Sequence, residues 1–582
     1  MNPNWDLSYL YKGFDDPAFL ADLKRFPEEI KVEQAILDGG DDPQTKLEKL
    51  TDQQEVLGAL ADRLSSFCNL TQAVDANDAD ATKYLNVLDV IFNDSRIVSS
   101  AITRYIGSLA NLEDLIAASP KLQKVAFHLR ESAENAHHTI PEAVEPWILE
   151  MSLSGGSAFS QLRDKLDSTH TANYRGQEIP LSAVRGLAYD ADASVRKDAY
   201  EAEIASYKKM ELPMSYCLNA VKMEARTLSK AKGYPSVLDM TLSDSRMDRA
   251  TLDAMLTAIR EYLPHFRRYM KAKAKLLGHQ NGLPFYDLFA PVGQNVHTYT
   301  VEEAREMLVR LMGQFTPEMG KFIDNAFEQR WIDIYPREGK TGGAFCSPVH
   351  FADRSLVMTN FTGSFSDVST IAHELGHAWH NRCLAGLPYS LIDTPMPLAE
   401  TASIFNEQLL AHMVLKDASP DEQLSLLEGS LMETNQTIVD IYSRYLFETE
   451  VIDTRADHAM NVDELKDAML RAQEASYGDG LDPEIRHPYI WACKSHYYSS
   501  GYNFYNFPYA FGELFAKGVF AQYLQKGAAF VPDYCRLLRS CGSGTIADVA
   551  ASVGIDVRNP DFWRSSLEVV KGNIDKFCEL VK

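Results

Sequence analysis

The sequence predicts a large, mainly α-helical protein. Apolar residues recur at helical spacing through most of the 582 residues, and strand signals are scarce outside residues 340–365. No repeat at a solenoid period and no low-complexity tract interrupts this pattern. Length alone would suggest about three or four domains, but the continuous helical pattern favours one packed unit. Within it we predict an N-terminal helical region, residues 1–150, and a second region, residues 151–582, which carries the motifs described below.

A helix is predicted around residues 373–377, which read His-Glu-Leu-Gly-His. Ser366 and Asp367 are candidates for its N-cap, because their side chains can accept a hydrogen bond from a free amide of the first turn. From Val368 to Cys383 the apolar residues fall at helical spacing, and Pro388 follows as a stop signal. A helix with this pattern is largely buried, so its polar side chains need partners.

The two histidines of this helix are candidate metal ligands. His373 and His377 lie four residues apart, so both imidazoles project from one face and can bind one zinc ion. Glu374 is placed to take a proton from a water molecule at the metal, as the general base of a metallopeptidase. The alternative interpretation is a chance match or a structural histidine pair, and the buried character of the helix favours the metal site.

A catalytic zinc site has three protein ligands, so a third is expected elsewhere in the chain. Pro397 suits the first turn of a second helix, and Glu400, early in that helix, is the predicted third ligand. Glu407 lies two turns later on the same face. It is either an acceptor for the N–H group of a ligand histidine or a surface carboxylate, and the sequence leaves both open.

His380 lies one turn past His377. We expect it to support a ligand or to pack in the core rather than to bind the metal. The longer metzincin pattern would require glycine and histidine where this chain has His380 and Cys383, which disfavours that class. The eight cysteines form no C-x-x-C pair, and we predict that they are reduced thiols.

Together with its surroundings, the motif resembles the oligoendopeptidase F family of zinc metallopeptidases, relatives of thimet oligopeptidase. The resemblance is carried by residues 5–8, 286–288, 331–336, 342–346, 373–380, 400–407, 496–498 and 504–509, in the expected order. It implies two helical lobes around a deep substrate channel, a small β-sheet next to the zinc helix and one zinc ion per chain. It also implies that short peptides enter the channel and folded proteins do not.

The same resemblance gives a substrate-contacting role to a segment rich in histidine and tyrosine. His496 and Tyr509 are the predicted catalytic donors to the substrate carbonyl or the developing oxyanion, and Tyr502 and Tyr505 are predicted substrate contacts. The alternative interpretation is an aromatic-rich core segment. Gly343 is also predicted to bind substrate, because glycine permits a close approach of the backbone.

Residues 354–361 read as a short strand directly before the zinc helix. As an exposed edge strand it could hold an extended peptide by main-chain hydrogen bonds, which suits broad sequence tolerance. The alternative is ordinary sheet structure, and the sequence leaves both open.

Composition narrows the range of partners. Net charge is −24, from 57 basic and 81 acidic residues, which argues against nucleic acid, since phosphate binding needs a basic face. The first residues show no basic region followed by an apolar one, and no apolar run is long enough to cross a membrane. We therefore expect a cytoplasmic enzyme that acts on peptides and does not bind membranes. The oligomeric state is not indicated.

The predicted function is zinc-dependent hydrolysis of internal bonds in short oligopeptides. Two alternatives stay open. One is an exopeptidase of the dipeptidyl carboxypeptidase type on a similar fold, which would need a cation for the terminal carboxylate of the substrate. The other is a peptide-binding protein that has lost catalysis, which the presence of Glu374 and all three predicted ligands disfavours.

Overall fold

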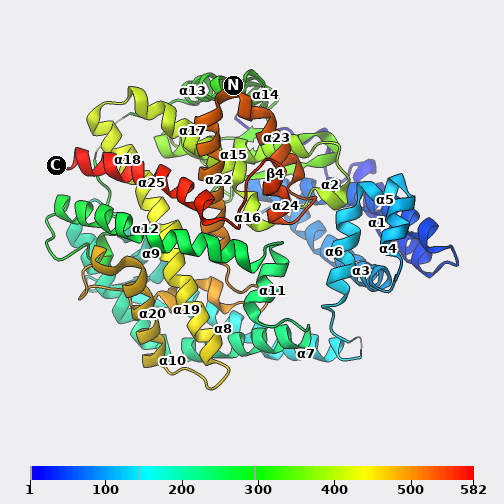
Figure 1. Ribbon diagram of the computed structural model, residues 1–582, viewed down its shortest axis with the longest axis horizontal. Coiled ribbons are helices and arrows are strands. Elements are labelled where there is room, and N and C mark those ends of the chain that lie inside the picture. Colours follow the sequence, from blue (N-terminus) through cyan, green and yellow to red (C-terminus); the bar gives the residue numbers. More distant parts are fainter. Residues whose placement is uncertain (1–2, 142, 294–296) are drawn as a thin grey trace. The chain divides into compact units, whose positions relative to one another are not determined.

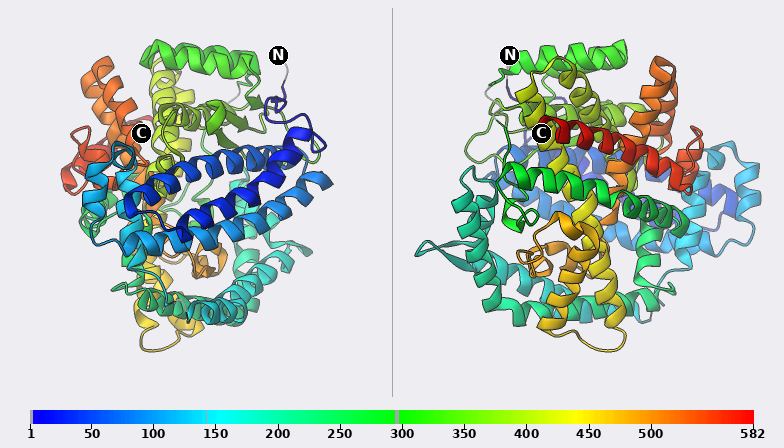
Figure 2. Two further views of the ribbon diagram at one scale, coloured as in Figure 1. Left: turned by 90° about the vertical axis from the view of Figure 1, so that its right-hand side faces the viewer. Right: turned by 60° about the vertical axis from the view of Figure 1, so that its left-hand side comes forward.

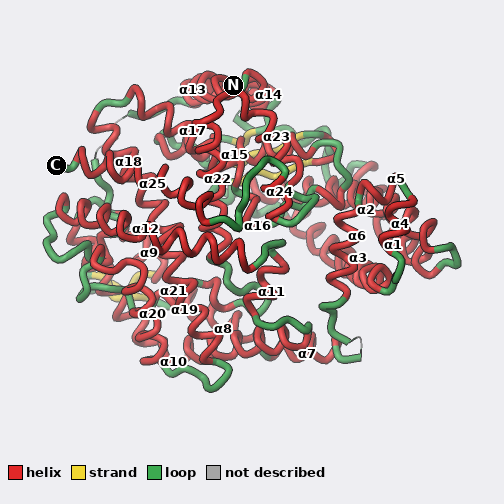
Figure 3. Tube along the Cα trace, in the orientation of Figure 1, coloured by secondary structure: helices red, strands yellow, loops and turns green. Residues whose placement is uncertain are grey.

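The computed structural model describes residues 3–141, 143–293 and 297–582. Helices dominate it, and the strands are few and short (Figure 3). The mainly helical class is therefore confirmed. The chain divides into two compact units, each assembled from three segments of sequence. Unit 1 contains Met1–Thr139, Val296–Met413 and Gln522–Ile555, and unit 2 contains Ile140–Asn295, Val414–Ala521 and Asp556–Lys582. The division after residue 150 and the substrate channel stay predictions.

Unit 1 holds the helices that begin the chain and those that carry the histidine motif (Figure 1). Its helices are α1 (Pro17–Asp38), α2 (Pro43–Val74), α3 (Ala79–Gly107), α4 (Leu112–Ala118), α5 (Pro120–Lys124), α6 (Ala126–Ala136), α13 (Val301–Phe315), α14 (Pro317–Glu328), α15 (Phe365–Leu384), α16 (Met396–Ala399), most of α17 (Thr401–Asp417), α23 (Val531–Ser540) and α24 (Ile546–Ala551). Its 3-10 turns are His350–Ala352, Tyr389–Leu391 and Gly527–Phe530.

The first helices of unit 1 show why these elements form. Asp16 and Asp42 cap α1 and α2, and in both helices a proline occupies the first position, where its missing N–H group costs nothing. The two helices lie side by side (Figure 2) and bury apolar faces against each other, with Phe19 and Leu64 fully buried. Burial of such faces is the main source of stability for this region.

A three-stranded sheet in unit 1 lies against α15. Its strands are β3 (Ile332–Asp333), β4 (Phe345–Val349) and β5 (Arg354–Met358), in the order β3-β5-β4. β5 pairs with β3 in parallel and with β4 antiparallel, so it is the central strand and is buried from Ser355 to Met358. The predicted strand over 354–361 is thus three residues shorter and is not an edge strand. The predicted small sheet beside the helix with the histidine motif is confirmed.

Unit 2 holds the remaining helices and a short hairpin. Its helices are α7 (Glu145–Ser154), α8 (Gly156–Thr169), α9 (Leu181–Gly186), α10 (Ala193–Ala231), α11 (Val237–Asp244), α12 (Arg249–Leu276), α18 (Pro420–Asn435), α19 (Ile441–Thr454), α20 (Val462–Tyr477), α21 (Ile490–Cys493), most of α22 (Phe507–Lys526) and α25 (Pro560–Leu580). The hairpin pairs β1 (Thr171–Tyr174) with β2 (Gln177–Pro180). The 3-10 turns are Leu187–Tyr189, Phe285–Asp287, Gly478–Gly480 and Ser495–Tyr498, and a π-helical turn, Gln436–Asp440, joins α18 to α19.

Two long parallel helices organise unit 2. α12 and α25 run side by side over most of their length (Figures 1 and 2). A second core forms where α10, α19 and α20 meet the segment around Trp491, which is fully buried together with Tyr207 and Phe447. In the part of the chain that the structure describes, no helix combines the length and the apolar character needed to cross a bilayer. All eight cysteines are free thiols.

Candidate metal centre

The helix that carries the histidine motif, α15, begins at Phe365. Its N-cap is Ser364, whose hydroxyl accepts a hydrogen bond from the Asp367 amide at 3.0 Å. The Asp367 carboxylate in turn accepts from the amides of Ser364 and Thr362, which completes a capping box. The predicted N-cap at Ser366 or Asp367 is therefore wrong by two or three residues. Asp367 does take part in the cap, but from the third helical position.

Close packing of α15 against α17 depends on Gly376. A Cβ atom at this position would lie 2.5 Å from the carbonyl oxygen of Ala402 and 2.6 Å from Cα of Ser403, which is too close for any other residue. The amide of Asn406 then donates to the carbonyl of Ala372 at 3.0 Å, which fixes α17 along α15. The glycine between the two histidines thus permits the second helix to reach them.

This packing brings three donor groups together. The Nε2 atoms of His373 and His377 each lie 3.3 Å from Oε2 of Glu400, and all three donor atoms lie within 4.8 Å of one another. We call these residues the metal cluster. Glu400 lies at the break between α16 and α17 rather than inside one helix, so the predicted placement early in a helix is corrected. Ser403 donates to the Glu400 carboxylate at 2.7 Å and holds it in place.

The electrostatics of the metal cluster suit a cation. Burial alone would lower the pKa of His373, but its hydrogen bonds to Glu400 and Glu407 raise that pKa to about 10. Burial opposes ionisation of Glu400, and the bonds from His373 and His377 hold its pKa well below the usual range. The side chains therefore stabilise a positive charge at their centre. Two imidazole nitrogens and one carboxylate oxygen are also the donor set of many catalytic zinc sites.

Glu407 and Glu374 complete the surroundings of the metal cluster. Oε1 of Glu407 lies 2.8 Å from Nδ1 of His373. In the neutral ring that a metal ligand requires, Nδ1 would therefore carry the proton and Nε2 would face the cluster. Of the two interpretations of Glu407, the structure thus favours the acceptor over the surface carboxylate. Glu374 is 6% exposed, and burial raises its pKa, an effect that the neighbouring histidines oppose. A carboxylate with a raised pKa is a better proton acceptor.

His380 supports α15 from the side of α23. Its Nε2 atom lies 3.1 Å from the carbonyl oxygen of Leu538, and its ring is 4% exposed. Burial and the nearby His377 lower the pKa of His380 to about 4, so the ring is neutral at pH 7 and donates its N–H group to Leu538. Its contact is with the core and not with a ligand side chain.

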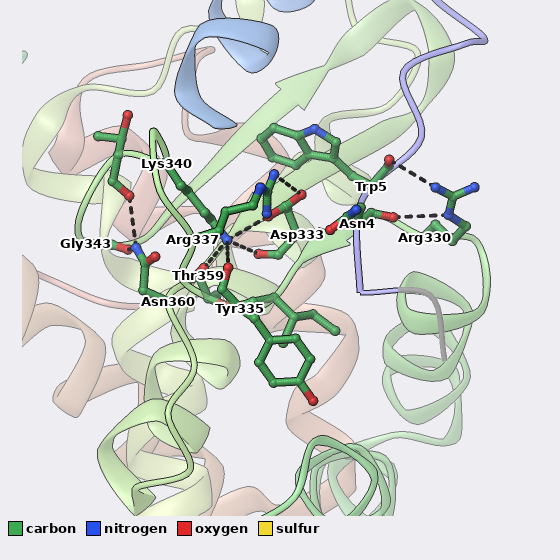
Figure 4. Close-up of polar contacts among 12 residues, drawn as sticks. Asn4, Trp5, Arg330, Asp333, Tyr335, Arg337, Lys340, Gly343, Thr359 and Asn360 are labelled. Atoms are coloured by element: carbon green, nitrogen blue, oxygen red, sulfur yellow. Dashed lines mark hydrogen bonds and ion pairs between the residues drawn. The ribbon is translucent and has the colours of Figure 1, made fainter. Parts of the chain in front are cut away.

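Strand β4 forms an edge of the sheet beside α15, and a glycine loop leads into it. Gly343 has a φ of +82°, which other residues rarely adopt, and a Cβ atom there would meet nothing within 4 Å. The side-chain amide of Asn360 donates to the carbonyls of Thr341 and Gly343 at 3.0 and 2.8 Å, which fixes the loop (Figure 4). Gly343 therefore lies at an open position next to an edge strand, as a substrate contact requires.

A buried ion pair holds the base of this loop, and the sequence analysis missed it. Lys340 has a fully buried side chain, with Nζ 2.6 Å from the Asp333 carboxylate. The same Nζ donates to the carbonyls of Asp333, Tyr335 and Thr359 (Figure 4). Arg337 adds two further bonds to Asp333. Asp333 lies in a segment that carries the family resemblance, but no sequence pattern relates it to Lys340. Only the tertiary structure shows that the pair ties the loop to β3 and β5.

The predicted histidine and tyrosine residues come together within unit 2, in residues 495–509, which we call the Tyr segment. The ring centroid of His496 lies 5.2 Å from that of Tyr505 and 6.4 Å from that of Tyr509, and Tyr502 is 5.9 Å from Tyr505. Tyr502 is 69% exposed. Burial and the positive charge of Arg444 lower the pKa of His496, so its ring is neutral and can donate an N–H group.

The Tyr segment is anchored by a buried ion pair that sequence reasoning also missed. Glu448 accepts hydrogen bonds from the Phe504 amide at 3.0 Å and from the Asn506 side chain at 2.7 Å. Lys222 lies 2.7 Å from Glu448 and also donates to Asn503. Lys222 and Glu448 are 226 positions apart in the sequence, so no local pattern relates them.

Comparison with known proteins places the chain in a family. The model of peptidase family M3 matches residues 186–569, and that of oligopeptidase F matches residues 108–171. The chain belongs to peptidase family M3. It is 23% identical to an oligoendopeptidase F homolog of Lactococcus lactis over 99% of this chain and 97% of that protein. It is also 23% identical to oligopeptidase PepF of Bacillus subtilis, over 92% and 81% of the two chains.

Solved structures share the fold. A putative peptidase from Chlamydophila abortus superposes with a TM-score of 0.86 at 23% identity, over 100% of this chain and 99% of that one. An oligoendopeptidase F from Enterococcus faecium gives a TM-score of 0.70 at 18% identity, over 97% and 98%. The family assignment confirms the predicted enzyme class, a metalloendopeptidase of the M3 family. The roles of the individual site residues stay predictions.

Proposed function

We propose that this M3 peptidase is a zinc-dependent endopeptidase that cuts internal bonds of short peptides. The observation that carries the proposal is the metal cluster, in which two imidazole nitrogens converge on one carboxylate beside the buried Glu374. Zinc bound there would acidify a water molecule and polarise the scissile carbonyl. The curated relatives named as oligopeptidases and oligoendopeptidases support short peptides as the substrate class.

Each group of side chains has a separate role in the proposed hydrolysis. Glu374 takes the proton of the attacking water and delivers it to the leaving amine. Glu407 keeps His373 in the tautomer that presents Nε2, and His380 keeps α15 in place through Leu538. The free edge of β4 pairs with the main chain of an extended peptide, while the Tyr segment supplies neutral donors for the developing negative charge.

The test is cleavage of an internally quenched peptide of about ten residues with both ends blocked, with metal content assayed on the same sample. We expect cleavage that a chelator abolishes and added zinc restores, since the metal supplies the activated water. Cleavage of free-ended peptides only would indicate an exopeptidase. Stoichiometric zinc without any cleavage would indicate a peptide-binding protein, and either result would overturn the proposal.

A further inference from the structure

A cavity of about 770 Å³ lies entirely within unit 2. Its wall is formed by the C-terminal part of α10, the start of α11, the second half of α19 and Phe504 of the Tyr segment. This volume is in the range of sites that bind small molecules. None of the residues predicted to act in peptide hydrolysis lines it, so the cavity needs a separate explanation.

The lining of the cavity is cationic. Arg226, Lys230, Arg249 and Arg455 face it, and Asp453 is the single carboxylate of the lining. Arg249 is also paired with the Asp239 carboxylate, at 3.0 Å, outside the lining. The chain as a whole has a net charge of −24, so this local excess of positive charge runs against its composition. Concentrated positive charge in a concave surface attracts anions.

Hydrogen bonds to backbone carbonyls use only part of the donor capacity of these cations. Arg226 donates to the carbonyl of Ile452 at 2.8 Å, and Arg455 donates to that of Asn219 at 3.1 Å. Each bond uses one of the five N–H donors of a guanidinium group, so others remain for a ligand. The side chain of Lys230, in the last turn of α10, forms no hydrogen bond or ion pair within the described residues, and its positive charge interacts favourably with the helix dipole. The helix dipole and the pairing of Arg249 with Asp239 account for two of the four cations. Arg226 and Arg455 form no ion pair within the described residues and need another explanation.

Two further features point to a bound molecule. Ser229 lines the cavity and is 2% exposed, and its hydroxyl has no hydrogen-bond partner among the described residues. A buried hydroxyl without a partner is costly, and a ligand oxygen would relieve that cost. Tyr234, Tyr445 and Phe504 add flat apolar surface to the same wall. We propose that this cavity binds a small organic phosphate with a flat apolar body.

Binding here would touch the Tyr segment. Phe504 has a φ of +52°, unusual for a residue with a side chain, and its ring lies 5.7 Å from that of Tyr445. A ligand between these rings and the arginines would hold Phe504, and with it the segment that carries His496 and Tyr509. We therefore expect an occupied cavity to change peptide turnover, an expectation that rests on the proposed function.

The binding experiment is calorimetric titration of the full-length protein with ADP, inorganic pyrophosphate and adenosine as probes. ADP should bind more tightly than either fragment, because it uses both the cations and the rings. Lys230→Glu should weaken ADP binding at least about tenfold, since a repulsive charge replaces an attractive one. Lys208→Glu, an exposed position on the same helix, should leave it unchanged. His377→Ala should also leave it unchanged, which excludes chelation at the metal cluster.

The proposed binding site would be refuted if ADP did not bind the wild-type chain. It would also be refuted if Lys230→Glu and Lys208→Glu weakened ADP binding equally. Thermal unfolding midpoints check that each variant folds, and Lys230→Gln provides a milder change should the charge reversal fail. Turnover of the quenched peptide is then measured with saturating ADP. An effect that disappears in Lys230→Glu supports the coupling, and no effect despite binding overturns the coupling alone. Neither binding result depends on whether the chain cleaves peptides.

Discussion

The metal cluster and the Tyr segment are built in different ways. The metal cluster draws on residues 373–407, two helices that pack against each other through Gly376, and its side chains hold one another through short contacts. The Tyr segment is an irregular stretch that depends on Glu448 and Lys222, far away in the sequence. Its His496 has a buried Nδ1 atom that no described residue contacts by a hydrogen bond.

This difference indicates a division between a preorganised centre and an adaptable one. A metal site needs fixed donors, because ligand geometry determines affinity. A segment that binds substrates of varied sequence needs polar groups that can form hydrogen bonds with the substrate. Substitutions in the metal cluster should therefore abolish function, whereas substitutions in the Tyr segment should reduce it by degrees.

Among substitutions that leave the metal cluster itself intact, the largest effect is expected from Glu374→Gln. The amide keeps the size of the side chain but cannot accept the water proton, so turnover should fall by about 10⁴-fold while metal content stays at one per chain. Peptide cleavage and metal analysis on the same preparation test this. Glu306→Gln, at an exposed position of α13, is the matched control and should behave as wild type. Substantial residual turnover would show that another group is the base.

Tyr509→Phe should have the next largest effect. Loss of one hydroxyl donor to the developing oxyanion should lower kcat by about 10²-fold to 10³-fold and change KM little. Steady-state kinetics on the quenched peptide separate the two parameters. Tyr216→Phe, an exposed tyrosine of α10, serves as control. A rise in KM at constant kcat would instead make Tyr509 a residue that positions the substrate.

Glu407→Gln should weaken the metal cluster without destroying it. The amide oxygen can still accept a hydrogen bond from His373 Nδ1, but it lacks the negative charge of the carboxylate. Zinc affinity should therefore fall by about 10-fold to 100-fold. Competition with a fluorescent chelator measures this affinity directly. The control is again Glu306→Gln. Unchanged affinity would mean that Glu407 has no influence on the ligand.

The smallest effect concerns pH and the buried His380. The pKa of His380 is about 4 in the folded chain, against a reference value of 6.5 that stands for the unfolded chain. The unfolded chain therefore binds the proton first as the pH falls. Stability from this group is complete above pH 6.5 and decreases down to pH 4, with about 2 kcal/mol lost at pH 5. Thermal midpoints at pH 7 and pH 5 report the loss. The midpoint of His380→Gln should depend less on pH than that of wild type or His137→Gln, and an equal dependence would refute this assignment.

The helix around the histidines could be predicted because its evidence is local. The spacing of His373 and His377 and the apolar pattern around them depend on helix periodicity alone. The exact start could not be predicted, since Ser364 and Ser366 are equally good caps in isolation. The reciprocal bond with Asp367 distinguishes them, and it forms only once the turn is made.

Other features depend on contacts between distant segments. Residues 354–358 were compatible with an edge or a central strand, and pairing with both β3 and β4 decides between them. Lys340 with Asp333, and Lys222 with Glu448, are buried pairs that look like ordinary surface charges in the sequence. The glycine of the histidine motif gave no sign of its role, because its neighbour Ala402 comes from the next helix.

The contact between His380 and Leu538 has a consequence for synthesis of the chain. The two residues are 158 positions apart, and α15, the helix with His373 and His377, is made first. At about 5–20 residues per second, a ribosome needs about 8 to 32 seconds to translate the interval. During that time the helix has no α23 to pack against. Completion of unit 1, which includes Gln522–Ile555, is therefore an event of late translation.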